Sequence, residues 1–125
     1  MNKQVLKQLK SLQPGDLVKV VWLDASIGKS LAGGSIDVPV HSYGIYLGLL
    51  GKKSKHVILA QNTFRYSDNI FDIDYTAIPT GWGINVTVLK AGEVDQDTAR
   101  ALLSSFLQGR SRTLKRRKTN HARMD

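Results

Sequence analysis

The chain has 125 residues, of which 42% are hydrophobic and 22% charged, a composition typical of one globular domain rather than of a disordered chain. It contains no cysteine, which excludes disulfides, thiolate metal sites and catalytic thiols. The formal net charge of +8 favours polyanions such as nucleic acid as partners.

Residues 2–12 are predicted to form a short amphipathic helix. Its apolar residues recur on one face at helical spacing, at Val5, Leu6, Leu9 and Leu12. Lysines form a stripe on another face of this helix, which is typical of a solvated surface. The QPGD segment (13–16) ends the helix, because proline followed by glycine favours a turn.

Five short segments that follow have the composition and alternation of β-strands. The lysine-rich GKKSK segment joins the second to the third and favours a hairpin between them. The expected strands are residues 17–23, 43–49, 56–61, 75–79 and 84–89.

The spacing of these strands favours a small, strongly bent barrel. A long loop (24–40) separates the first two strands, and a single turn at PTGW separates the last two. This order is that of a five-strand Src-homology-3-like barrel, and a helix followed by five strands is also the order of the Sm-like fold. The residues expected to be largely buried are Val20, Trp22, Ile45, Leu47, Ile58, Ile78, Val86 and Val88.

A second short helix is predicted over residues 95–109. Asp95 or Asp97 can cap its start, and Gly109 is a natural end. We therefore expect one barrel domain with flanking helices over residues 1–108, followed by a basic, flexible tail over 109–125.

Four segments resemble a pattern found in small uncharacterised proteins of phages, prokaryotes and archaeal genetic elements. The pattern combines Val-x-Trp-x-Asp-Ala, Val-Leu-Ala-Gln and Ile-Pro-x-x-Trp, and it covers roughly residues 15–90 of this chain. The resemblance implies a small β-barrel and carries no established activity. The matching segments are VKVVWLDAS (18–26), HSYGIYLG (41–48), HVILAQN (56–62) and AIPTGWGINVTVL (77–89).

The residues with catalytic or metal-binding chemistry do not form a recognisable site. The PGDLVKV and HSYGIYLG segments resemble papain-like hydrolases superficially, but that chemistry requires the cysteine that this chain lacks. The histidines have no short metal-ligand spacing, and the acidic segment 67–74 lacks the glycine and glutamate of a helix-loop-helix calcium site. We expect no enzyme activity, no cofactor and no bound metal.

The end of the chain carries most of the net charge. Residues 1–108 contain 11 Lys and Arg against 9 Asp and Glu, whereas residues 109–125 contain 7 against 1. Such a segment binds phosphates without reading base edges. The residues predicted to contact nucleic acid in this tail are Arg110, Arg112, Lys115, Arg116, Arg117, Lys118 and Arg123.

Arg65 and Tyr66 are a second candidate contact, because an arginine between aromatic residues is typical of base stacking. We therefore expect a non-catalytic protein that binds DNA or RNA without sequence preference, with homo-oligomers also conceivable. No apolar run approaches the roughly 18 residues of a membrane span. We expect a cytoplasmic protein, or one of the host cytoplasm if its source is viral, without a membrane partner.

The alternative is a protein-interaction or self-assembling barrel that does not bind nucleic acid. Small barrels can pair through exposed strand edges, and Trp22 or Trp82, if exposed, could hold an extended peptide. The tail would then only make the assembly soluble.

Overall fold

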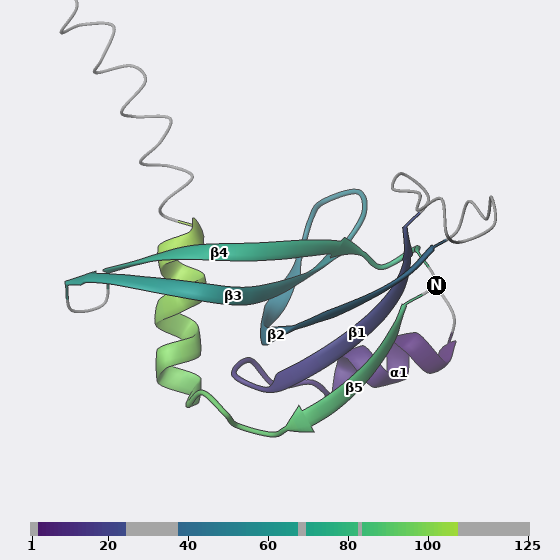
Figure 1. Cartoon of the computed structure of the whole chain (residues 1–125), viewed down its shortest axis with the longest axis horizontal. Helices are drawn as coiled ribbons and strands as arrows, with labels where there is room; N and C mark the ends of the chain where they lie inside the picture. Colours follow the sequence, from purple (N-terminus) through teal and green to yellow (C-terminus); the bar gives the residue numbers. More distant parts are fainter. Residues whose placement is uncertain (1–2, 25–37, 68–69, 83, 108–125) are drawn as a thin grey trace, which may run out of the picture.

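A computed structural model describes residues 3–24, 38–67, 70–82 and 84–107 (Figure 1). Five antiparallel strands form one sheet in the order β4-β3-β2-β1-β5, which confirms the predicted mainly β fold with a short helix at each end. Residues 96–107 are helical and are called the C-terminal helix. The other elements are α1 (Lys3–Ser11), β1 (Leu17–Asp24), β2 (Val38–Leu50), β3 (His56–Ser67), β4 (Ile70–Pro79) and β5 (Asn85–Lys90).

The sheet is open, and its predicted closure into a Src-homology-3-like or Sm-like barrel is not confirmed. β4 and β5 form the two edges, and no ladder joins them among the described residues. Instead, the turn after β4 reaches β1 through a hydrogen bond from the Leu23 N–H to the Trp82 carbonyl oxygen (3.0 Å). α1 lies beside β5, where the Gln8 side chain accepts a hydrogen bond from the Val86 N–H (3.2 Å) and donates one to Asn85 (3.1 Å) (Figure 1). α1 therefore pairs with part of the β5 edge, the edge that would have to pair with β4 if the barrel were closed.

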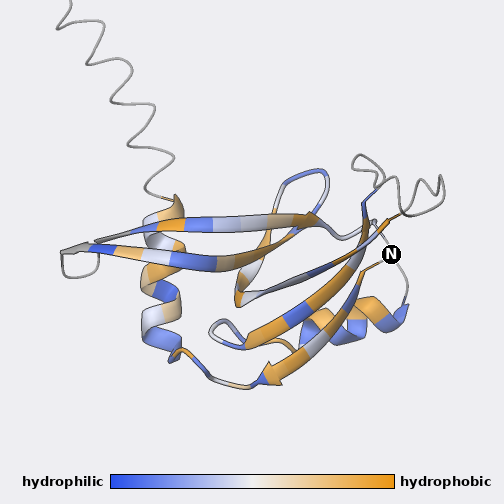
Figure 2. Ribbon diagram, viewed as in Figure 1, coloured by the Kyte–Doolittle hydropathy of each residue, from blue (hydrophilic) through white to orange (hydrophobic). Residues whose placement is uncertain are grey.

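β3 and β4 extend well beyond the predicted strands. After Ala60, β3 no longer pairs with β2 and continues with β4 alone, from Asn62 opposite Asp74 to Ser67 opposite Ile70. We call this two-stranded extension the ribbon. The sequence predicts a loop here because polar residues interrupt the strand pattern, but the β-branched and aromatic residues of the segment favour an extended backbone. Both strands of the ribbon carry hydrophobic and hydrophilic residues in close succession (Figure 2).

The main core lies between α1 and one face of the sheet. α1 contributes its predicted apolar face, except that Leu6 is 39% exposed. The opposing residues come from every strand, because side chains alternate between the two faces of a sheet. The buried members of this core are Val5, Leu9, Leu12, Val18, Val20, Tyr46, Val57, Leu59, Ile78, Ile84 and Val86.

A second, smaller core lies on the opposite face of the sheet, under the C-terminal helix. Leu102 of that helix packs with Leu47, Ile58 and Ala60. β3 is thus buried on both faces, which explains its continuous apolar run over residues 57–60.

The predicted core residues are confirmed in most positions. Val20, Leu47, Ile58, Ile78 and Val86 are buried, with at most 7% of any of these residues exposed. Trp22 and Ile45 are half-buried at the margins of the two cores.

The prediction for Val88 is wrong, because this residue is 41% exposed. The Gln8 side chain of α1 contacts the edge strand β5 at Val86. Val88 lies beyond this contact, toward the end of β5.

The QPGD turn anchors the start of the C-terminal helix to the sheet. The Gly15 N–H donates to the Tyr46 carbonyl oxygen, and the Gly15 carbonyl oxygen accepts from the Val94 N–H (both 2.9 Å). Buried Asp16 accepts from the N–H groups of Gln13 (3.0 Å) and Gly92 (2.9 Å). These bonds fix the helix relative to β2 and thereby place the pocket described below.

Replacing Gly51 with alanine is expected to destabilise the protein by about 1–3 kcal/mol. Gly51 has a φ of 132°, and a Cβ there would overlap the Ser54 carbonyl oxygen. Denaturant titration measures the change in the free energy of unfolding. Gly81→Ala is the control because a Cβ at Gly81 has open space around it. An equal, small effect of both changes would contradict the assigned turn geometry.

Asp95 caps the C-terminal helix, as one of the two predicted alternatives. Its carboxylate accepts hydrogen bonds from the Thr98 N–H (2.9 Å) and the Thr98 hydroxyl (2.6 Å). These bonds favour the charged form and lower the pKa of Asp95. The exposed Asp97 instead pairs with Arg100 (3.3 Å).

The Asp95 cap is expected to lose its effect in acid. Because the folded pKa lies below the unfolded one, the stabilisation is complete above the unfolded pKa, near 4, and is lost as the pH falls through the folded pKa. Asp95→Ala should therefore lower the thermal unfolding midpoint at pH 6, and the difference from wild type should shrink at pH 3. A difference that stays constant between these pH values would contradict the charged cap.

Candidate functional site

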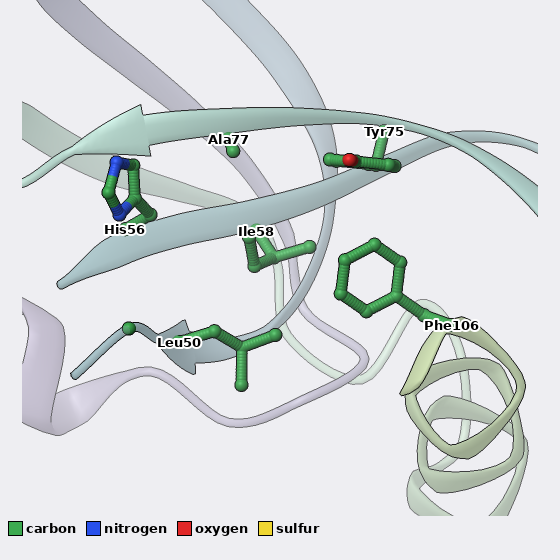
Figure 3. Close-up of a pocket in the computed structure, with 7 residues that line it drawn as sticks. Leu50, His56, Ile58, Tyr75, Ala77 and Phe106 are labelled. Atoms are coloured by element: carbon green, nitrogen blue, oxygen red, sulfur yellow. The ribbon is translucent and has the colours of Figure 1, made fainter. Parts of the chain in front are cut away.

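A pocket of about 350 Å³ lies between the C-terminal helix and the face of the sheet that the helix covers (Figure 3). It is at the lower end of the roughly 300–1,000 Å³ range of small-molecule pockets. The hairpin of β2 and β3, the middle of β4 and the end of the helix supply its walls. The lining residues are Leu50, Gly51, His56, Ile58, Tyr75, Ala77 and Phe106.

Two aromatic rings form one wall of the pocket. The ring centroids of Tyr75 and Phe106 are 4.7 Å apart, and the ring planes meet at 77°. Such an edge-to-face pair holds each ring in place. Tyr75 remains 49% exposed, so its ring is accessible from solvent beside the half-buried Phe106.

Two polar side chains, His56 and Tyr75, line the pocket (Figure 3). The His56 imidazole and the Tyr75 hydroxyl form no hydrogen bond or ion pair with any described residue. An imidazole and a phenol can each donate or accept a hydrogen bond. The pocket therefore combines apolar walls with two groups that can orient a polar ligand edge.

A cluster of lysines adjoins the pocket. Gly51 and His56 line the pocket and bracket the turn between β2 and β3, so the turn projects from the pocket rim. Its three lysines are exposed, and none of the described residues that line the pocket is acidic. We call Lys52, Lys53 and Lys55 the lysine turn. Its charge favours anionic ligands at the rim.

Arg65 lies on the ribbon, away from the lysine turn. Arg65 is exposed and lies opposite Phe71 in the ladder. Phe71 is four positions from the pocket residue Tyr75 along β4, and residues an even number of positions apart in a regular strand share a face. Arg65 therefore lies on the face of the sheet on which the pocket opens.

Phe64, Asp72 and Asp74 lie on the opposite face of the ribbon. Phe64, 48% exposed, lies opposite Asp72, and the Asn62 side chain donates to Asp74 (3.3 Å). The side chain of Tyr66 is outside the described part of the structure. The predicted stacking role of Arg65 and Tyr66 stays a prediction.

The seven predicted contact residues of the tail all lie outside the described residues. Their predicted contact with nucleic acid stays a prediction.

Of the two tryptophans that the sequence offers for holding a peptide, Trp22 is half-buried and Trp82 is 39% exposed. Trp22 and Trp82 pack against each other with centroids 5.9 Å apart, and the Trp22 Nε1–H donates to the Ser42 hydroxyl (3.0 Å). Asp24 is buried and makes polar interactions. Within the described ranges, no three His, Cys, Asp or Glu residues are grouped to hold a metal ion.

Sequence reasoning missed the pocket because its lining residues come from four separate elements. The sequence predicts that His56 begins a strand and that Phe106 lies in a helix, and nothing links the two residues in the sequence. The one feature of the sequence that points to this region is the group of lysines in the GKKSK turn.

Comparisons of the chain with protein-family models, with curated proteins and with solved structures find no match. Among the described residues, no helix is long and apolar enough to span a membrane.

Proposed function

We propose that the protein binds nucleic acid without sequence preference, through its basic segment 109–125, and that it is not an enzyme. The observation that carries this proposal is the separation of charge along the chain. Residues 109–125 hold +6 of the net charge of +8, and the remaining 108 residues hold +2. A globular domain that needed charge only for solubility would have no reason to concentrate it in one terminal segment.

The mechanism rests on counterion release. Each Lys or Arg that neutralises a phosphate displaces a condensed cation, and this gain is independent of the base sequence. Seven cations against one acid also repel one another, and a polyanion removes that repulsion. The sequence of the segment carries no base-reading motif, so DNA and RNA of any sequence are expected ligands.

The test compares the full chain with a chain that ends at Gln108 in an electrophoretic mobility shift assay at low salt. The full chain should shift duplex DNA, a scrambled duplex of equal length and single-stranded RNA at similar protein concentrations. The shortened chain should keep the circular dichroism spectrum of the folded domain and bind far more weakly. Failure of the full chain to shift any nucleic acid at low salt would refute the proposal.

A second candidate function is self-association through the sheet edges. β4 and β5 are edge strands, and each pairs on one side only within the described part of the chain. Unpaired strand edges are templates for pairing with another chain. Such pairing would use the edge of β4, or the part of the β5 edge that Gln8 of α1 does not contact.

Sedimentation of the full chain and of the chain ending at Gln108 separates these functions. Self-association that survives the truncation and that high salt does not weaken would favour the second candidate. A monomer in both cases would leave the basic segment as the functional part.

A further inference from the structure

We propose that the pocket between the C-terminal helix and the sheet receives one unstacked base of a single-stranded nucleic acid, whose neighbouring phosphates lie on the lysine turn. This inference rests on the proposed function and adds a site on the folded domain to it. The juxtaposition that carries it is an aromatic wall, two polar groups that form no hydrogen bond with a described residue (the His56 imidazole and the Tyr75 hydroxyl), and three lysines at one rim.

The shape of the pocket suits one flat ring. The exposed ring of Tyr75 and the half-buried ring of Phe106 form an aromatic surface, and their edge-to-face contact holds both rings in place. Ile58 and Ala77 form an apolar floor beside them (Figure 3). Every base has a flat apolar face that stacks on aromatic side chains, and stacking tolerates any base. This agrees with binding that does not depend on sequence.

The polar groups suit the edge of a base. The His56 imidazole and the Tyr75 hydroxyl can each donate or accept a hydrogen bond. Neither group is already hydrogen-bonded to a described residue. Single-stranded nucleic acid exposes base edges that a duplex engages in pairing. A duplex cannot place a base in the pocket without extruding it, which costs a few kcal/mol.

The charge at the rim suits phosphates rather than a protein side chain. Lys52, Lys53 and Lys55 are all exposed on the turn that joins two lining residues, and the described part of the pocket lining contains no acidic residue. An apolar side chain of a partner protein would fit the aromatic wall, but the three lysines would not attract it. A nucleotide can stack its base on the aromatic rings and place its phosphate near the lysines.

The experiment measures the affinity of the full chain for two labelled oligomers by fluorescence anisotropy at low salt. One is an oligothymidylate of about twelve nucleotides, within the site sizes of small single-strand-binding domains. The other is an abasic oligomer of the same length, which keeps the phosphates and lacks the bases. Wild type should bind the oligothymidylate more tightly.

The variants remove the stacking surface or the rim charge separately. Tyr75→Ala, and Phe106→Leu as a change that preserves burial, should each weaken oligothymidylate binding by about 5- to 150-fold, the loss of one stacked base, and leave abasic binding unchanged. Lys52→Gln with Lys53→Gln should weaken binding of both oligomers equally. Tyr43→Ala is the matched control, because Tyr43 is 52% exposed on the sheet and does not line the pocket.

The outcomes are distinguishable. Equal binding of the two oligomers by wild type, or equal effects of Tyr75→Ala and Tyr43→Ala, would overturn the pocket proposal while leaving the basic segment as a binder. Absence of binding to both oligomers would overturn the proposed function and the pocket proposal together. Unfolding midpoints of each variant show that the comparison is made between folded proteins.

Discussion

Leu59→Ala is expected to lower the free energy of unfolding by about 2–5 kcal/mol. Leu59 is fully buried in the main core, where its side chain lies among residues of α1 and of the neighbouring strands. Its truncation removes buried apolar atoms and leaves a cavity that a curved sheet held by ladders on both sides cannot close easily. Urea denaturation measures the loss.

Leu47→Ala is expected to cost a similar amount, although Leu47 lies on the other face of the sheet. It is also fully buried, and Leu102 of the C-terminal helix covers it. The two residues contribute to different cores, so the double variant should lose close to the sum of the single losses. Leu89→Ala is the control, because Leu89 is 50% exposed and should change stability by less than about 0.5 kcal/mol.

A small effect of Leu47→Ala beside a large effect of Leu59→Ala would mean that the C-terminal helix does not cover the sheet in solution. That result would also remove the wall that Phe106 gives the pocket, and the pocket proposal with it.

Local pattern was sufficient to predict the elements whose burial differs between their two faces. The alternation of β5 placed Val86 toward the core, and the apolar stripe of α1 placed Val5 and Leu9 there. The capping chemistry of Asp95 was also readable, since an aspartate before an apolar periodic segment is a common helix start.

Contacts between elements that are distant in the sequence could not be predicted from local pattern. Residues 62–65, 72 and 74 of the ribbon are exposed and Ile73 is only partly buried, so sequence alone predicts a loop at Asn62 and Asp74, although they lie opposite each other in a ladder. Barrel closure depends on whether β4 and β5 meet, and that depends on the position of α1 rather than on either strand. The pocket depends on the same kind of contact, because Phe106 meets Tyr75 only after the helix has docked.

The affinity of the full chain for duplex DNA is expected to fall steeply with salt. If five of the seven basic residues of segment 109–125 each neutralise one phosphate, the logarithm of the binding constant falls against the logarithm of salt concentration with a slope of about −4.5. Between 50 and 200 mM salt this slope corresponds to a loss of about 500-fold in affinity. For single strands the slope is shallower, about −3.5.

Charge-neutral substitutions locate the cations that produce this slope. Replacing the four consecutive cations Lys115, Arg116, Arg117 and Lys118 with glutamine should make the slope shallower by about 3.6, because four phosphate contacts are lost. Replacing Lys3, Lys7 and Lys10 is the control for net charge, because these exposed lysines lie on α1 in the folded domain. That variant should keep the slope of wild type. If it loses the slope while the variant of the basic segment keeps it, the folded domain binds the polyanion, and segment 109–125 only adds solubility.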